Sequence, residues 1–322
     1  MSSAVLVRNV RKAYDKHVAV EDVSLEVPQG IVFGLLGPNG AGKTTTIRMI
    51  MDIIRPDSGS VEIFGGTPNT VTLDGIGYLP EERGLYKRMK VLDVLGYLGS
   101  LKGIEAAEAR RRAVTWLDKV GLAAWKERKI EELSKGMAQK VQFVSTLLHE
   151  PKLLILDEPF SGLDPVNANQ LKDLFVEVNR AGATIIFSTH MMESAEKLCR
   201  QIALISKGRV VLEGSIGDVK RHYGRNNVLL EFDGDSGFLK ALPGVKGVDD
   251  YGAYSEVMLK DGADPQELLA GVAPRVKLRR FEIVEPTLHN IFIQVAGPDA
   301  AEALKASEAA SHAAVSGAGG AR

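Results

Sequence analysis

The first two thirds of the chain alternate between short apolar segments and longer segments with helical periodicity. The apolar segments are rich in Val, Ile and Leu and predict strands at residues 25–36, 60–66, 75–79, 152–157, 183–189 and 201–205. Apolar residues that recur every three or four positions predict helices at residues 43–54, 91–102, 106–121, 135–149, 166–181 and 191–200. This alternation of strands and helices predicts an α/β fold with a largely parallel sheet.

The pattern changes after residue 224. Residues 227–234, 254–260 and 276–284 alternate between apolar and polar positions and are separated by Gly- and Asp-rich segments, so we expect three strands joined by turns. We therefore predict a first domain of residues 1–224 and a small α+β domain of residues 225–297. Residues 298–322, rich in Ala, Gly and Ser, bury too little apolar surface to offset ordering entropy and are predicted to be a disordered tail.

Composition narrows the function classes only slightly. The 322 residues carry 40 basic and 41 acidic side chains, so the net charge of -1 gives no reason to expect nucleic acid as a partner. No stretch approaches the roughly 18 apolar residues of a membrane-spanning helix, so we expect any work at a membrane to go through a partner. The single cysteine, Cys199, cannot form an internal disulfide and suits a reducing cytoplasm.

A glycine-rich segment between a predicted strand and a predicted helix carries the first chemical signal. It fits the pattern G-x-x-x-x-G-K-[ST] with Gly37, Pro38, Asn39, Gly40, Ala41, Gly42, Lys43 and Thr44. Backbone N–H groups of such a loop and the N-terminus of the following helix face phosphate oxygens. Lys43 is expected on the β- and γ-phosphates, Thr44 on Mg²⁺, and Thr45 near the α-phosphate. The ligand is predicted to be a nucleoside triphosphate.

Two acidic residues and a histidine stand where further predicted strands end. Asp157 ends the strand of residues 152–157 and is expected to hold hydrated Mg²⁺, while Glu158 is expected to orient or deprotonate the attacking water. His190 follows the next strand, and its neutral imidazole can hydrogen-bond the γ-phosphate and the water. We expect Lys43, Glu158 and His190 to act in hydrolysis.

The segment LSKGMAQKVQF at residues 133–143 identifies the class of nucleotide-binding protein. Ser134 is a plausible helix N-cap, and Gly136 leaves the backbone beside it open, so a second helix N-terminus is available to phosphate. The order of Tyr14, the phosphate loop, this LSGGQ-like signature, LLILDEP, SGLD and His190 resembles the ATP-binding cassette (ABC) family over about residues 4–220. The resemblance implies a phosphate-loop cassette with antiparallel and helical subdomains, and implies an ATPase that uses ATP and Mg²⁺.

The resemblance also implies roles for individual residues. Tyr14 matches the aromatic residue that stacks on adenine, and Asp164 matches the loop that links the two ATP sites. Two cassettes dimerise head to tail in the family, as a homodimer or with a second cassette, so that the signature of one chain closes over the ATP of the other. The signature residues here are Ser134, Lys135, Gly136 and Met137.

This chain departs from the family pattern at three of these positions. Lys135 and Met137 stand where the signature usually has Gly and Gln, and Glu81 stands where the family usually has a glutamine that contacts Mg²⁺. A carboxylate can still bind this hard cation. Glu82, the next residue, is the alternative for that position.

The rest of the chain points to the transport partner. The segment after Glu81, residues 83–103, is similar to the part of the family that forms a groove for a permease helix, and residues 225–296 resemble the accessory domain of cassettes that pair with ABC-2-type export permeases, notably the sodium-efflux branch. The resemblance implies an exporter subunit at the cytoplasmic face of the membrane. A soluble cassette protein with a non-transport or regulatory role is the alternative, and the transported substrate is left open.

Overall fold

The computed structural model describes residues 2–15, 17–82, 84–223, 227–260, 262–297, 302–304 and 306–307. The chain divides into two compact units, one of Met1–Gly214 with Val295–Arg322 and one of Ser215–Gln294. The predicted boundary at residue 224 lies outside the described residues. Within the described part of the chain, no helix is both long and apolar enough to cross a membrane.

The first unit is built on a nine-stranded sheet of order β4-β1-β2-β9-β8-β3-β7-β6-β5. Its strands are β1 (Ser3–Tyr14), β2 (His17–Pro28), β3 (Val32–Leu36), β4 (Ser58–Ile63), β5 (Ile76–Leu79), β6 (Leu153–Asp157), β7 (Thr184–Thr189), β8 (Gln201–Ser206) and β9 (Arg209–Ser215). Strand β3 pairs in parallel with β7 and β8, and β6 pairs in parallel with β5 and β7. Strand β1 pairs antiparallel with β2 and β4. The predicted α/β fold with a largely parallel sheet is confirmed.

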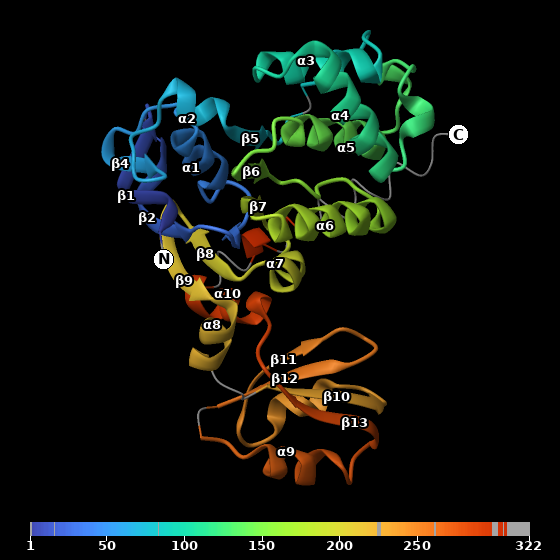
Figure 1. The fold of residues 1–322 in the computed structure, drawn as a ribbon. Helices are drawn as coiled ribbons and strands as arrows, with labels where there is room; N and C mark the ends of the chain where they lie inside the picture. The colour runs from blue at the N-terminus through green and yellow to red at the C-terminus, as the bar shows by residue number, and fades with distance from the viewer. Residues whose placement is uncertain are drawn as a thin grey trace. The chain divides into compact units, whose positions relative to one another are not determined.

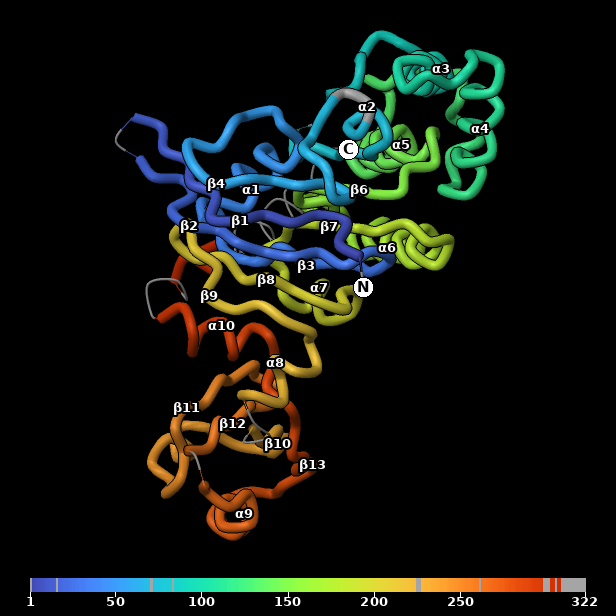
Figure 2. Tube along the Cα trace, turned by 60° about the vertical axis from the view of Figure 1, so that its left-hand side comes forward, coloured from blue at the N-terminus to red at the C-terminus, as the bar shows by residue number. Residues whose placement is uncertain are grey.

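Helices cover both faces of this sheet, as Figures 1 and 2 show. They are α1 (Lys43–Ile50), α2 (Thr70–Asp74), α3 (Val91–Leu101), α4 (Ala106–Lys119), α5 (Lys135–Leu147), α6 (Pro165–Arg180) and α7 (Met192–Leu198). One core packs α1 against β1, β2 and β3, and the other packs α3, α4, α5 and α6 together. Strand β6 serves both, since Leu153 and Ile155 enter the first core and Leu154 and Leu156 the second. Burial on both faces explains its continuous apolar sequence.

All six predicted helices of the first unit are found, with one or both ends moved by one to four residues. The single strand predicted at residues 25–36 is wrong, because the chain turns at Gln29 and Gly30 between β2 and β3. The apolar residues on both sides of that turn concealed it. Helix α2 was not predicted, because it is one short turn capped by the Asn69 side chain.

The second unit contains a four-stranded antiparallel sheet of order β11-β12-β10-β13. Its strands are β10 (Asn227–Asp233), β11 (Val245–Asp250), β12 (Ser255–Leu259) and β13 (Lys277–Val284), and its helices include α8 (Ile216–His222) and α9 (Pro265–Val272), with α10 (Leu288–Ala296) following. Val228, Val257 and Leu268 are in its apolar core. The connection between the first two predicted strands of this unit was expected to be a turn, and this is wrong in part, because Val245–Asp250 form the edge strand β11.

The described part of the predicted tail is short. Residues 302–304 and 306–307 are helical, and Leu304 and Ser307 are buried. The rest of residues 298–322 lies outside the described residues.

Candidate nucleotide-binding and hydrolysis site

The phosphate loop connects β3 to α1, and its backbone depends on two glycines. Gly42 is the N-cap of α1 with φ of 109°, and Gly37 has φ of 148°, a region that side chains rarely adopt. A Cβ at Gly37 would lie 2.2 Å from the carbonyl oxygen of Ile205, and one at Gly42 would lie 2.6 Å from that of Ala19. The loop is therefore packed directly against neighbouring backbone, and its shape is fixed before any ligand arrives.

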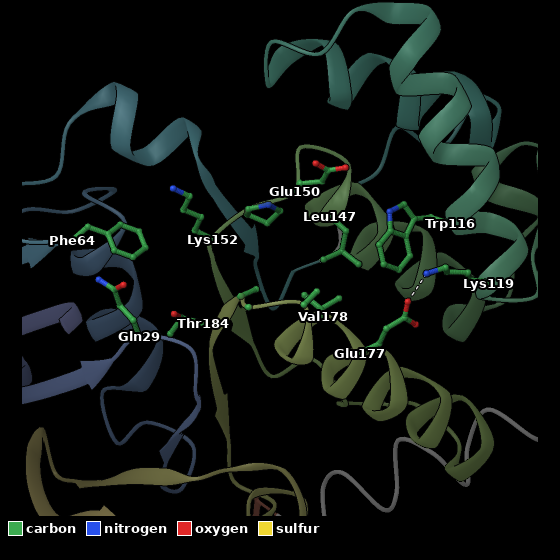
Figure 3. Close-up of a pocket in the computed structure, with 14 residues that line it drawn as sticks. Gln29, Phe64, Trp116, Lys119, Leu147, Glu150, Lys152, Glu177, Val178 and Thr184 are labelled. Atoms are coloured by element: carbon green, nitrogen blue, oxygen red, sulfur yellow. Dashed lines mark hydrogen bonds and ion pairs between the residues drawn. The ribbon is translucent and has the colours of Figure 1, made fainter. Parts of the chain in front are cut away.

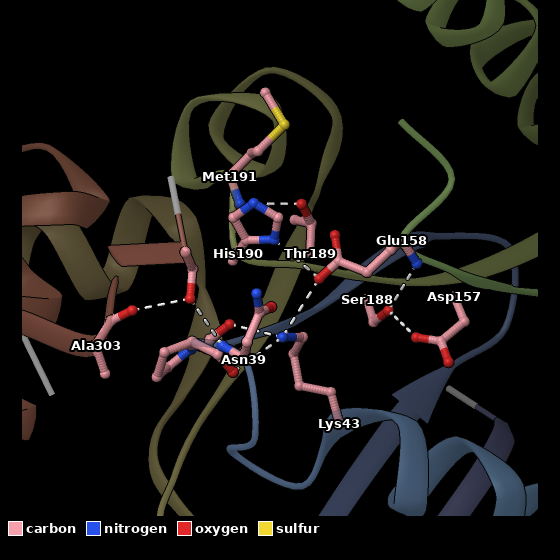
Figure 4. Close-up of polar contacts among 12 residues, drawn as sticks. Asn39, Lys43, Asp157, Glu158, Ser188, Thr189, His190, Met191 and Ala303 are labelled. Carbon is pink, nitrogen blue, oxygen red and sulfur yellow. Dashed lines mark hydrogen bonds and ion pairs between the residues drawn. The ribbon is translucent and has the colours of Figure 1, made fainter. Parts of the chain in front are cut away.

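Lys43 is held inside this loop by its own chain. Its side chain is 5% exposed, and its Nζ donates to the carbonyl oxygens of Gly37 at 2.8 Å and Pro38 at 3.1 Å. The Nζ also lies 3.3 Å from Oε1 of Glu158. Figure 4 marks this ion pair by a dashed line. A buried ammonium needs such partners to offset its desolvation. An incoming phosphate finds this cation already positioned.

Two carboxylates follow one another at the end of β6. Asp157 is 1% exposed and accepts a hydrogen bond from the Ser188 hydroxyl of β7. Glu158 has a positive φ of 46°, and its N–H donates to the same Ser188 oxygen at 2.9 Å. Ser188 thus holds both residues from the adjacent strand, and the local strain at Glu158 turns its side chain to a different place from that of Asp157.

Glu158 lies between a cation and a histidine. Its Oε1 is 3.3 Å from Lys43 Nζ and 3.1 Å from Nδ1 of His190, which is 3% exposed (Figure 4). His190 reaches this position because it directly follows β7, the strand next to β6. A buried carboxylate oriented by an imidazole has the arrangement of a general base and its positioning partner.

Asp157 has the features of a metal ligand. Burial raises the pKa of its carboxyl, while hydrogen bonds from the Ser188 and Thr44 hydroxyls act in the opposite direction. Among the described residues its Oδ2 is buried and has no hydrogen-bond partner. An unsatisfied buried carboxylate oxygen is costly unless something binds it. Mg²⁺, which prefers carboxylate and hydroxyl oxygens, fits this position beside Thr44.

Glu81 follows β5 and faces the same group of charges. Although its side chain is largely exposed, partial burial, followed by the charges of Asp157 and Glu158, raises the pKa of its carboxyl. Its loop is held from α5, because Gln142 Nε2 donates to the carbonyl oxygen of Glu82 at 3.3 Å. A small cavity of about 160 Å³ lies here, lined by Leu79, Pro80, Glu81, Gln139, Gln142, Asp157, Glu158 and Ser161.

A cavity of about 510 Å³ brings Tyr14 together with the phosphate loop, Glu81 and Glu158. It is lined by Tyr14, His17, Ala19, Asn39, Gly40, Gly42, Lys43, Thr44, Thr45, Glu81 and Glu158. Tyr14 ends β1, and its ring is 45% exposed. The cavity therefore runs from an exposed aromatic ring to the phosphate loop and the carboxylates, which matches a base at one end and phosphates at the other.

The signature residues do not line this cavity. Ser134 is the N-cap of α5, and its hydroxyl accepts from the N–H of Met137 at 3.2 Å. Ser134 and Lys135 are exposed, Gly136 is buried and Met137 is half-buried. Asp164 caps α6 in the same way, accepting from the N–H groups of Val166 and Asn167. A helix N-terminus exposed at its cap can receive an anion from another molecule.

The C-terminal segment reaches the phosphate loop. The N–H of Asn39 donates to Ser307 Oγ at 3.1 Å, and the Ser307 hydroxyl in turn donates to the carbonyl oxygen of Ala303 at 2.8 Å (Figure 4). Nothing in the sequence predicted this contact, because Ser307 lies in a low-complexity segment. One loop amide is therefore occupied by the chain itself.

A second, larger cavity of about 610 Å³ lies at the other end of the parallel strands. Figure 3 shows its lining, which includes Thr184 at the start of β7, Lys152 just before β6, and the ion pair between Lys119 and Glu177. Ligands of open α/β sheets bind beyond the carboxyl ends of the strands. We therefore assign the nucleotide to the smaller cavity at the phosphate loop.

Sequence reasoning missed three polar residues that support the site. Ser188 bonds to both Asp157 and Glu158. Gln139 donates to the carbonyl oxygen of Pro159, and Gln142 donates to that of Glu82 in the Glu81 loop. The signal for Ser188 was a hydroxyl two residues before His190 in a strand otherwise rich in apolar residues. The signal for the two glutamines was their place on the buried face of α5, where a polar side chain is expected to have a hydrogen-bond partner.

Two known protein families match this chain. Residues 20–161 match the family model described as ABC transporter, and residues 214–296 match the model of the C-terminal domain of DrrA1-3-like ATP-binding proteins. The chain is 43% identical over 289 residues to YhaQ, an uncharacterized ABC transporter ATP-binding protein of Bacillus subtilis, covering 90% of this chain and 97% of YhaQ.

A further relative and a solved structure also match. The chain is 32% identical over 298 residues to the daunorubicin/doxorubicin resistance ATP-binding protein DrrA of Streptomyces peucetius, covering 89% of this chain and 90% of DrrA. A solved structure of an ATP-binding subunit of an ABC transporter superposes with a TM-score of 0.63 at 32% identity, covering 69% of this chain and 93% of that one.

Proposed function

The chain belongs to the ABC transporter ATP-binding proteins and is an ATPase of that family, and on this premise we propose that it drives an exporter whose permease is a separate chain. The export role is supported by the match of residues 214–296 to the C-terminal domain of DrrA1-3-like ATP-binding proteins. Hydrolysis is supported by the Glu158 carboxylate, held between Lys43 and His190 beside the phosphate loop. This arrangement suits hydrolysis rather than nucleotide storage, because it places a general base beside the position proposed for the γ-phosphate.

Binding begins at the phosphate loop. The backbone N–H groups of the loop and of the N-terminus of α1 donate to the phosphate oxygens, and Lys43 Nζ moves from the carbonyl oxygens of Gly37 and Pro38 to the β- and γ-phosphates. Tyr14 at the far end of the cavity stacks on the adenine, a contact worth about 1 to 3 kcal/mol in comparable base–aromatic pairs.

Hydrolysis follows from the position of Glu158. Its carboxylate orients a water for attack on the γ-phosphorus and accepts a proton from it, while His190 Nδ1 fixes the carboxylate in place. Lys43 and the loop amides stabilise the charge on the transferred phosphoryl group. Thr44, Asp157 and Glu81 would hold Mg²⁺, whose chemical contribution is to neutralise phosphate charge.

A second cassette completes the site. Ser134 and Lys135 are exposed at the N-terminus of α5 and do not line this chain's own cavity. In a head-to-tail dimer, homomeric or with a second cassette, the segment Ser134–Met137 closes on the partner's γ-phosphate through backbone N–H groups. Asp164, at the start of α6, lies in the loop that links the two sites.

The permease is expected to bind beside the Glu81 loop. Tyr86 and Tyr97 are 49% and 43% exposed and form an edge-to-face pair with centroids 5.7 Å apart. Exposed aromatic residues of this kind are typical anchors for a partner. The bond from Gln142 to the carbonyl oxygen of Glu82 ties the loop before them to α5, the helix that carries the signature. Binding to an ABC-2-type permease would place the chain at the cytoplasmic face of the membrane.

The test is reconstitution with a candidate permease in lipid vesicles. We expect the permease to co-purify with the chain and to raise its ATPase rate severalfold, and we expect Tyr97→Asp to abolish this increase without changing the basal rate. Val114→Asp, which places the same charge at another exposed apolar position, is the control. Equal stimulation of Tyr97→Asp and wild type would overturn the assigned surface, and failure to bind any permease would favour the non-transport alternative.

A further inference from the structure

Asp57 makes hydrogen bonds to the three residues that precede Tyr14. Its Oδ1 accepts from Lys12 Nζ at 2.8 Å, and its Oδ2 accepts from the backbone N–H of Ala13 at 2.7 Å. Its own N–H donates to the carbonyl oxygen of Arg11 at 2.8 Å. One residue, placed just before β4, thus makes three hydrogen bonds to the end of β1.

This end of β1 needs such support. The pairing of β1 with β2 is irregular between Val10 and Lys12 and again between Lys12 and Ala13, so the regular ladder does not set the direction of the strand. Hydrogen bonds from Lys12 and Ala13 lower the pKa of the Asp57 carboxyl, which is therefore ionised at neutral pH. A charged carboxylate accepting two bonds is a stronger tether than a neutral one.

Lys12 also contacts the Tyr14 ring. Its Nζ lies over the ring at 5.7 Å from the centroid, while its bond to Asp57 fixes where the ammonium sits. A cation over one face of an aromatic ring is held by the ring quadrupole, and it leaves the opposite face for a second planar group. The ring itself lines the cavity of about 510 Å³ that also contains Lys43.

We propose that Asp57 and Lys12 are positioning residues for the purine base of ATP, which hold the Tyr14 ring at the angle required for stacking. The inference rests on the proposed function, because it takes Tyr14 as the base platform. Neither residue reaches the phosphate loop or the carboxylates among the described contacts. Both therefore act on nucleotide affinity and leave the chemical step unchanged.

A second ion pair between the same strands supplies a matched control. Arg8 of β1 pairs with Glu62 of β4, in the regular part of the ladder and away from Tyr14. If Asp57 only joined β1 to β4, then Asp57→Ala and Glu62→Ala would behave alike. If it positions the ring, only Asp57→Ala would weaken ATP binding.

The experiment measures ATP affinity and turnover for Tyr14→Ala, Asp57→Ala, Asp57→Asn, Lys12→Met and Glu62→Ala, with inorganic triphosphate as a ligand that lacks the base. We expect Asp57→Ala and Lys12→Met to raise KM for ATP about three- to tenfold at unchanged kcat, which is part of what full loss of stacking costs. Asp57→Asn keeps an acceptor for the N–H of Ala13 but loses the charge, so its KM should lie between those of these variants and that of wild type. Triphosphate binding should not change in any of these variants.

A double variant separates the possible failures. We expect Asp57→Ala in a Tyr14→Ala background to add nothing, because its effect passes through the ring. If Tyr14→Ala alone leaves KM unchanged, the base platform of the proposed function is wrong, and this inference falls with it. If Tyr14→Ala weakens binding but Asp57→Ala matches Glu62→Ala, or weakens triphosphate binding equally, the inference alone is overturned.

Discussion

The phosphate loop and the N-terminus of α5 are the two places where we propose that backbone N–H groups bind phosphate, and they differ in how many of the required contacts one chain supplies. The phosphate loop is packed against backbone and holds Lys43 at 5% exposure with three partners. At α5, Ser134 satisfies only the N–H of Met137, and Ser134 and Lys135 are exposed. The first site is preorganised within one chain, whereas the residues of the second do not line the nucleotide cavity of their own chain.

This difference separates binding from hydrolysis. A single chain contains the cavity, the cation and the carboxylates needed to hold a nucleotide. In the proposed dimer, the amides at the N-terminus of α5 reach the nucleotide of the partner cassette and not that of their own chain. Changes at the phosphate loop should therefore affect every nucleotide-dependent property, whereas changes at α5 should affect only those that need two chains.

Glu158→Gln should produce the largest effect. The substitution keeps the shape and the contact with Lys43 but removes the base, so we expect ATP binding to persist while hydrolysis falls by about 10² to 10⁴. Single-turnover ATPase assays beside equilibrium nucleotide binding measure both. Turnover at the wild-type rate would show that Glu158 is not the base.

Ser134→Arg should have the next largest effect and should sharpen the comparison. An arginine at the N-cap of α5 blocks close approach of a second cassette and removes the cap, so we expect hydrolysis to fall by about 10² with nucleotide affinity of the isolated chain unchanged. Ser215→Arg, at the N-cap of α8, tests whether loss of any cap has this result. An equal loss of hydrolysis in both variants would contradict a site shared by two cassettes.

Glu81→Gln should have a smaller effect that depends on pH. Because partial burial and the charges of Asp157 and Glu158 raise the pKa of the Glu81 carboxyl in the fold, its protonated form is favoured there. Its stabilising contribution is complete below the unfolded-state pKa and is lost as pH rises through the folded-state pKa.

Without nucleotide, Glu81→Gln should therefore melt about 1 to 2 °C above wild type at pH 8, and the two should coincide near pH 4. Solvent exposure of Glu81 keeps the difference small. Thermal unfolding at several pH values measures it. A difference that does not vary with pH would exclude this electrostatic explanation.

Ser307→Ala should have the smallest effect. It removes the acceptor that occupies the N–H of Asn39, so this loop amide becomes available to phosphate and ATP affinity should rise about two- to threefold. Glu302→Ala, an exposed position on the same segment, is the control. Unchanged affinity in Ser307→Ala would mean that the contact does not compete with nucleotide.

Local signals in the sequence were enough to predict the parallel core. The apolar residues of β6 and β7 and the glycines of the phosphate loop determine the local structure with little help from distant residues. Lys43, Asp157, Glu158 and His190 are brought close together as expected. The fold class and the family were predicted for this reason.

The contacts that sequence could not reveal are those made by polar side chains far apart in the chain. Ser188, Gln142 and Ser307 look unremarkable where they stand, and each becomes important only because folding brings it to the carboxylates, the Glu81 loop or Asn39. The prediction of a single strand at residues 25–36 was wrong for a related reason. Apolar residues on both sides of Gly30 conceal the turn between β2 and β3. The predicted roles of the signature residues stay predictions, since they concern a second chain.

The ATPase rate of the purified chain as a function of its own concentration tests the central claim most directly. A site shared by two cassettes predicts a rate that rises more than linearly with concentration, and that loses this dependence in Ser134→Arg while nucleotide binding is kept. A rate strictly proportional to concentration and unaffected by Ser134→Arg would contradict the shared site and place hydrolysis within a single chain.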